Sequence, residues 1–217
     1  MKTTTLRHGR IELALHELRA GSGRALLLLH GLGERSPSAL PEEVSAWPGP
    51  VFALDFTGHG ASQLSRGGGY TAEVLMGDAD SALHKLGSAT LLGRGLGAYV
   101  ALLLAGARPR EVRGAILCDG LGLAGGGGEP GTPSLLFPNP SALGTPDAFA
   151  MVELARDVRP PDYATAFVRQ ANELSGLDRP ISVCCAEHPD WLDAALRETG
   201  VERARLADAL AEYAAIP

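Results

Sequence analysis

Apolar and polar residues follow one another along the chain in short blocks of two kinds. Ile11, Leu13 and Leu15 occupy every second position, so the segment 6–19 is predicted to form a pair of strands. Uninterrupted apolar runs further on are typical of strands covered on both faces. These strands are expected at 25–29, 51–54, 89–92, 112–118 and 181–186, with a short edge strand within 201–206.

Helical spacing of apolar residues fills the intervals between these strands. Thr71 is placed to cap a helix that extends to Leu86, and the apolar run 96–107 predicts a buried helix. Further helices are expected at 37–47, 161–174, 191–198 and 207–214. Short buried strands that alternate with helices predict the α/β class, with a doubly wound parallel sheet between two helical layers.

The segment 120–160 interrupts this alternation. It contains four successive glycines, 125–128, and several prolines, which favour a loop over core structure. No linker or internal repeat divides the rest of the chain. We therefore expect residues 1–217 to form one domain, with 120–160 as a short lid or loop insertion.

The composition fits a folded domain of this kind. Of the 217 residues 45% are hydrophobic and 20% are charged, which argues against disorder. No stretch of about 18 successive apolar residues is present, so no membrane span or membrane partner is expected. The first five residues lack the apolar centre of a signal peptide, and the predicted location is cytoplasmic.

Charge and cysteine content exclude further classes. The net charge is −6 and the 19 basic residues are scattered, which argues against a nucleic-acid partner. Cys118, Cys184 and Cys185 lack metal-binding spacing and are interpreted as reduced thiols, so no metal and no cofactor is predicted.

Three glycine-containing loops follow predicted strands and carry the candidate chemistry. The first, HGLG at 30–33, is suited to turning sharply and presenting backbone N–H groups, as an oxyanion hole requires. The second is DFTGHGAS at 55–62. The third is GRGLG at 93–97, between a strand and the apolar helix.

In this order and spacing the loops resemble those of the α/β-hydrolase superfamily, over nearly the whole chain. The resemblance implies a mostly parallel sheet of about seven to eight strands with an antiparallel N-terminal edge, and a pocket above the carboxyl ends of the strands. It also implies G-x-S-x-G at the third loop, with the serine as nucleophile. Here Gly95 stands at that position, and no histidine follows His188 to act as base.

Several residues remain as candidates around this altered site. Asp119 and Asp190 occupy the two positions where the family places its acid, although Asp190 also suits a helix N-cap. His188 is the histidine nearest to a triad position. The candidates for ligand binding are the first and third loops, through His30, Gly31, Leu32, Arg94 and Leu96, where the amides of Leu32 and Leu96 are expected to accept a carbonyl or carboxylate.

The sequence leaves the activity open. The preferred hypothesis is a catalytically inactive α/β-hydrolase homologue that binds a small apolar or carbonyl/carboxylate ligand or a protein partner. One alternative is an ester hydrolase or lyase with a non-standard constellation of residues. A second is dinucleotide binding, because residues 93–98 also fit G-x-G-x-x-A between a strand and a helix. A third is a purely structural or interaction protein, and the oligomeric state stays open.

Overall fold

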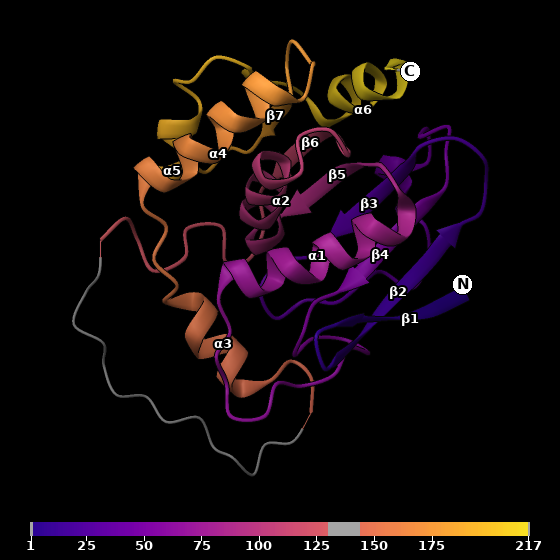
Figure 1. Ribbon diagram of the computed structural model, residues 1–217, viewed down its shortest axis with the longest axis vertical. Coiled ribbons are helices and arrows are strands. Elements are labelled where there is room, and N and C mark those ends of the chain that lie inside the picture. The colour runs from indigo at the N-terminus through magenta and orange to yellow at the C-terminus, as the bar shows by residue number, and fades with distance from the viewer. Residues whose placement is uncertain (1, 130–143, 217) are drawn as a thin grey trace.

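The computed structural model describes residues 2–129 and 144–216, which form an eight-stranded sheet with helices on both faces (Figure 1). The strand order is β1-β2-β4-β3-β5-β6-β7-β8. The strands are β1 (Lys2–His8), β2 (Ile11–Arg19), β3 (Ala25–Leu29), β4 (Val51–Asp55), β5 (Ala89–Arg94), β6 (Val112–Cys118), β7 (Ile181–Cys184) and β8 (Val201–Arg203).

The antiparallel edge predicted for the N-terminus is confirmed. β1 pairs with β2 and β2 pairs with β4 in antiparallel fashion, whereas every pair from β4 to β8 is parallel. The carboxyl ends of β3, β5, β6 and β7 therefore meet at one edge of the sheet. Loops that follow these strands are brought together there although they lie far apart in sequence.

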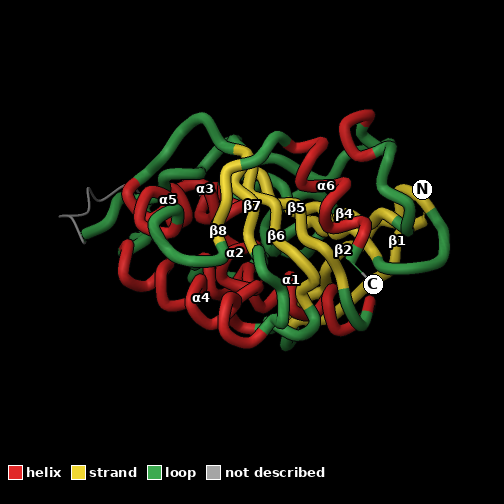
Figure 2. The backbone as a smooth tube through the Cα atoms, turned by 90° about the horizontal axis from the view of Figure 1, so that it is seen from above, coloured by secondary structure: helices red, strands yellow, loops and turns green. Residues whose placement is uncertain are grey.

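The helices are divided unequally between the two faces (Figure 2). One face is covered chiefly by α1, α2 and α4, and the other by the single turn η1 and by α6. Their bounds are η1 (Glu42–Val44), α1 (Ala72–Leu86), α2 (Leu96–Ala107), α3 (Ala148–Ala155), α4 (Pro161–Leu174), α5 (Asp190–Ala195) and α6 (Leu206–Ala215).

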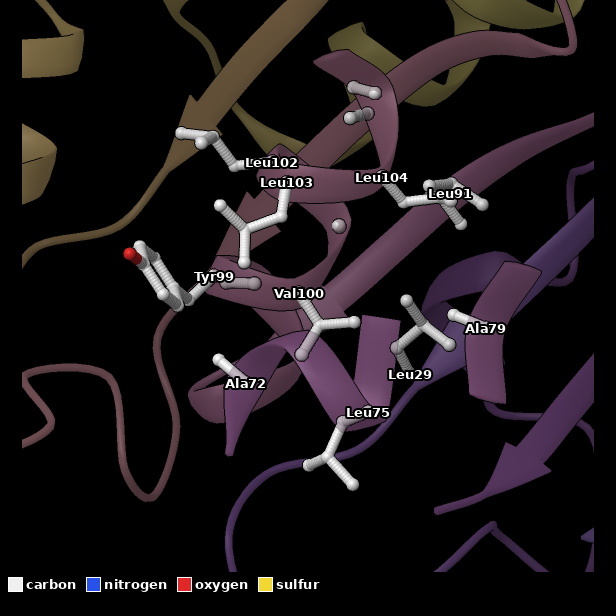
Figure 3. Packing of buried hydrophobic residues seen from close by; sticks show 14 of the residues in the cluster. Leu29, Ala72, Leu75, Ala79, Leu91, Tyr99, Val100, Leu102, Leu103 and Leu104 are labelled. Carbon is white, nitrogen blue, oxygen red and sulfur yellow. The ribbon is translucent and has the colours of Figure 1, made fainter. Parts of the chain in front are cut away.

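The larger core lies between the sheet and α2, whose residues are almost all buried. Val100 and Leu104 of α2 belong to the same core as Leu29 and Leu91 of the sheet and Leu75 of α1 (Figure 3). A helix that is apolar on all sides must be buried on all sides. α2 therefore fixes the turn at Gly95, which joins β5 to α2, firmly against the strand ends.

One predicted helix is much shorter in the structure, and one helix of the structure was not predicted. The helix expected at 37–47 is reduced to η1, because Pro41 and Pro48 supply no N–H and a proline ring inside a helix collides with the preceding turn. The sequence reading also missed α3, which begins after Asp147, whose carboxylate accepts the N–H of Phe149.

The segment 120–160, predicted to be a lid or loop insertion, is described only at its two flanks. Residues 119–129 form turns above the sheet, and α3 lies beyond the gap; residues 130–143 lie outside the described residues. Within residues 2–129 and 144–216, no helix combines the length and the apolar character needed to cross a membrane.

Candidate functional site

The turn between β5 and α2 has the backbone geometry of a nucleophile elbow. Gly95 has φ 57° and ψ −119°, a conformation that residues with a side chain rarely adopt. Its flanking residues allow the close approach of strand and helix, because a Cβ atom on Gly93 would collide with the carbonyl group of Gly97. The elbow is thus formed without a side chain at its apex.

The two amides expected to form an oxyanion hole are occupied by the chain itself. The N–H groups of Leu32 and Leu96 both donate to the carbonyl oxygen of Leu121, each at 2.9 Å. Leu121 follows β6, and the residue is 62% exposed although its carbonyl oxygen accepts both N–H groups. The backbone of this loop stands where an oxyanion would bind, and we call residues 119–125 the plug loop.

The plug loop also fills the space above Gly95. A Cβ atom at position 95 would lie 2.6 Å from the carbonyl carbon of Gly120 and 2.7 Å from the nitrogen of Leu121, and closer still to the Leu121 oxygen. Real Cβ atoms do not approach backbone atoms so closely. The position of the family's nucleophile is therefore incompatible with any side chain unless the plug loop moves.

Two buried side chains hold the plug loop in place. Arg159 is 1% exposed and donates from one terminal nitrogen to the carbonyl oxygens of Gly122 (2.6 Å) and Leu123 (2.5 Å). Trp191, also 1% exposed, donates its indole N–H to Leu123 at 2.9 Å. The Arg159 guanidinium also lies 4.7 Å above the ring of Tyr99. These contacts fasten the loop to α2 and α5.

Burial changes the pKa of the Arg159 guanidinium, which makes these contacts. It lowers the pKa of Arg159 to about 10, so the group is still a cation at neutral pH. Two of its nitrogens, Nε and the second terminal one, have no hydrogen-bond partner among the described residues. The cost of burying this charge is offset in part by the carbonyl oxygens and by the aromatic ring of Tyr99.

A cavity of about 860 Å³ lies beside the elbow, on the face covered by η1 and α6. Its apolar floor includes Leu28, Leu92 and Val183, at the ends of three parallel strands. The rim carries charges of both signs, from Arg35, Arg94, Arg203, Arg205, Glu34, Glu43 and Asp119. Gly95 is not among its lining residues.

Comparisons with known proteins agree with this architecture. A sequence model described as "Alpha/beta hydrolase family" matches residues 26–217. The chain belongs to the alpha/beta hydrolase family. A search of curated proteins finds no match.

Among solved structures, this α/β hydrolase is similar to a thioesterase domain from the curacin biosynthetic pathway (17% identity, TM-score 0.64, 99% of this chain and 97% of that one). It is equally similar to the hypothetical protein PA1622 from Pseudomonas aeruginosa PAO1 (20%, 0.63, 99% and 99%). Against alpha/beta hydrolase domain-containing protein 10 from mouse the identity is 22% and the TM-score 0.49; the match covers 58% of this chain and about half, 51%, of that protein. Identities this low establish the fold alone.

The acid candidates of this α/β hydrolase make contacts that shape loops. Asp119 accepts the N–H groups of Ala186 (2.7 Å) and Glu187 (3.1 Å), and so fixes the chain after β7. Asp190 does not cap α5: the N-cap is Pro189, and Asp190 is the exposed first helical residue. Pro189 has no side-chain acceptor, and its carbonyl oxygen accepts the N–H groups of Leu192 (2.8 Å) and Asp193 (3.0 Å).

His188 lies apart from the elbow's cavities. Its Nε2 is 3.1 Å from the carbonyl oxygen of Cys185, and its Nδ1 is 3.0 Å from Arg203 and 3.4 Å from Asp193. It lines neither the large cavity nor the shallower one of about 590 Å³ over the plug loop. After β8, only Ala204 and Arg205 precede α6, which leaves no loop for a histidine there.

The histidines of the first two loops are structural partners of the backbone. His30 accepts the N–H of Phe56 at Nε2 (3.1 Å), so its Nδ1 carries the proton donated to the oxygen of Gly31 (2.8 Å). The Nε2 atom of His59 likewise accepts the backbone N–H of Gly33 (3.2 Å). Of the five ligand candidates, His30 and Arg94 line the large cavity and Leu32 the shallow one. The Gly31 amide is taken by Glu34, 3.0 Å away, and the Leu96 amide by Leu121.

The buried state of His30 predicts a loss of stability in mild acid. Burial, with a smaller contribution from nearby His59, lowers the pKa of His30 to about 4. Between this value and the unfolded value of about 6.5 the unfolded chain binds more protons, so stability falls as pH drops through this window, by about 2–3 kcal/mol. Urea unfolding at pH 7.5 and pH 4.5 measures the loss.

Two variants separate His30 from the other titrating groups. His30→Asn is expected to be less stable at pH 7.5 but to lose less between the two pH values, whereas exposed His84→Asn keeps the full loss. An unchanged pH dependence in His30→Asn would show that other groups, such as His59, whose pKa burial also lowers, cause the acid sensitivity.

Proposed function

We propose that this α/β hydrolase is a non-catalytic binding protein, whose ligand is a small molecule with an apolar body and a carboxylate. The observation that carries the proposal is the Leu121 carbonyl oxygen, which occupies both oxyanion-hole amides above a nucleophile position that has no side chain. A carbonyl oxygen of the chain accepts the two hydrogen bonds that the oxygen of a substrate would have to accept. Acyl transfer by the family's usual route therefore lacks its nucleophile, its base and its oxyanion site together.

The large cavity has the features expected of a site for such a ligand. Its volume falls within the range of about 300–1,000 Å³ typical of small-molecule sites, and its floor is apolar. Arg94 is the last residue of β5 and lies at the rim, where its side chain makes no hydrogen bond or ion pair with the described residues. A free guanidinium beside an apolar floor favours a carboxylate, which it can bind through two parallel hydrogen bonds.

Decanoate binding tests the proposal, with decanol as the uncharged probe. Decanoate is expected to bind in isothermal titration calorimetry, and Arg94→Gln to weaken it about tenfold, the effect of losing one charge-assisted contact of about 1.4 kcal/mol. Decanol binding is expected to stay unchanged in that variant. Ala204→Trp, on the cavity wall, is expected to weaken the binding of both decanoate and decanol. The wild-type protein is expected to leave methyl decanoate unhydrolysed.

Arg66→Gln is the matched control, because Arg66 is exposed like Arg94 but lies in the loop before α1. Equal affinities in Arg94→Gln and Arg66→Gln would contradict the anchoring role of Arg94. Hydrolysis of methyl decanoate that disappears in Asp119→Asn or His188→Ala would instead favour the ester-hydrolase alternative.

The dinucleotide alternative meets the same obstacle as catalysis. A pyrophosphate at the start of α2 would need the Leu96 amide and the space above Gly95, both of which the plug loop takes. A thermal shift with millimolar NAD or NADP would revive that alternative.

A further inference from the structure

Two cysteines lie side by side on the wall of the large cavity. Cys118 is the last residue of β6 and Cys184 the last residue of β7, and the two are direct partners in the parallel register. Both line the cavity, Cys118 with 9% of its surface exposed and Cys184 half-buried. Neither has a role in the proposed binding of a carboxylate.

The sheet places both thiols on the same face. Partners in register on neighbouring parallel strands project their side chains to one side, while the next residue along the strand points to the other. Cys118 belongs to the core on the η1 and α6 face, and Cys184 packs against that core. Cys185 packs instead against the core of the opposite face, and its Sγ lies 3.3 Å from the carbonyl oxygen of Leu117.

The spacing of the strands permits a bond between the two sulfurs. Neighbouring strands lie about 4.8 Å apart, and disulfides join residues whose Cα atoms are about 4.4–6.8 Å apart with side chains on the same side. Cys184 and Cys185, in contrast, are adjacent residues whose side chains point to opposite faces. The pair Cys118 and Cys184 is therefore the favoured one among the three thiols.

The pKa values of the two thiols are shifted in opposite directions. A hydrogen bond between them lowers the pKa of Cys184 and, with burial, raises the pKa of Cys118. Burial raises the pKa of Cys185 to about 12. Since the thiolate is the reactive form, Cys184 is the expected nucleophile and Cys118 the resolving thiol.

We propose that Cys118 and Cys184 form a dithiol site in the cavity that closes to a disulfide by exchange with small disulfides such as oxidised glutathione. The Cys184 thiolate attacks one sulfur of glutathione disulfide and releases one glutathione thiolate. Cys118 then loses its proton and attacks the Cys184 sulfur, which releases the second glutathione. The two protein thiols are oxidised and one glutathione disulfide is reduced to two thiols, so the electrons balance.

Peptide mapping of the 217-residue chain tests the site. After incubation of the reduced protein with millimolar glutathione disulfide and alkylation of the remaining thiols, one of the three cysteines is expected to be alkylated. Trypsin is expected to yield residues 114–156 joined to residues 170–197, with the alkyl group on Cys185. Dithiothreitol is expected to separate the two peptides.

Single variants decide which sulfurs are joined. Cys118→Ser and Cys184→Ser are expected to lose the joined peptide, whereas the matched control Cys185→Ser retains it. A joined peptide that persists in Cys184→Ser, or three fully alkylated cysteines in the wild type, would overturn the proposal. The wild-type map decides the question even if a variant fails to fold.

The dithiol proposal and the ligand proposal fail separately. Disulfide formation is measured without decanoate and needs no ligand, so it can occur in a protein that binds no carboxylate. If both proposals hold, bound decanoate covers the thiols and slows the exchange. An exchange rate that saturating decanoate leaves unchanged would place that ligand outside the cavity that the two cysteines line.

Discussion

Gly95→Ser is expected to yield a less stable protein that gains no esterase activity. The serine would have to adopt a φ of 57°, which costs about 1–3 kcal/mol. Its Cβ atom would also push the plug loop away. Loss of the two hydrogen bonds to Leu121 adds about 1–3 kcal/mol. Urea unfolding is therefore expected to show a loss of about 2–6 kcal/mol. The serine would still have no histidine to accept its proton.

Gly9→Ser is the matched control for backbone strain. Gly9 has φ 59°, and a Cβ atom there would meet nothing within 4 Å. The difference in unfolding free energy between the two variants measures the collision with the plug loop. Neither wild type nor Gly95→Ser is expected to react with a fluorophosphonate; labelling of Gly95→Ser at position 95 would show that the loop yields and that a base is present.

The parallel sheet and most helices follow from the sequence because burial on both faces leaves a visible signal. The strand 25–29 and the helices 96–107 and 161–174 were predicted with the bounds that the structure has. The strand 25–29 and the helix 96–107 are uninterrupted apolar runs, and the helix 161–174 has apolar residues at helical spacing with charged residues between them. The apolar spacing of residues 37–47 predicts a helix, but the prolines in and after this region leave only η1.

The plug loop could not be predicted in the same way. Its decisive contact joins the backbone of residues 32, 96 and 121, and backbone groups are the same in every sequence. Glycines gave the only signal: a Cβ atom on Gly122 would lie 2.7 Å from that of Leu32, so the loop approaches the elbow only where glycine permits. Arg159, between Val158 and Pro160, carries no pattern that distinguishes it from a surface arginine.

The candidate site was therefore predicted only in part. The positions of the elbow and its amides follow from the glycine loops, and the structure places Gly95, Leu32 and Leu96 together. The sequence does not predict the partner of the two amides, because that partner depends on the conformation of residues 119–125 after β6. Asp119 and His188 are candidates because they follow strands. In the structure Asp119 accepts backbone N–H groups, and His188 contacts a backbone oxygen and a neighbouring side chain.

Trp191→Ala is expected to destabilise the protein and to release the plug loop before the rest of the fold. The ring is buried and packs edge-on against Tyr99, with 5.0 Å between ring centroids, and its indole N–H holds the oxygen of Leu123. Truncating a buried tryptophan costs about 3–5 kcal/mol, a large share of a typical stability of about 5–15 kcal/mol. Thermal unfolding is expected to shift downward by about 10 °C.

Hydrogen exchange distinguishes release of the loop from general destabilisation. Trp47→Ala is the matched control, because Trp47 is 2% exposed and donates its indole N–H to the oxygen of Arg24 (3.1 Å), but lies in the core of the other face. Both variants are expected to lower the protection of amides inside α2. Only Trp191→Ala is expected to lower the hydrogen-exchange protection of the Leu32 and Leu96 amides further. Both amides donate to the Leu121 oxygen, and Trp191 holds this part of the loop through its hydrogen bond to Leu123. Equal loss at these two amides in both variants would show that Trp191 does not hold the loop.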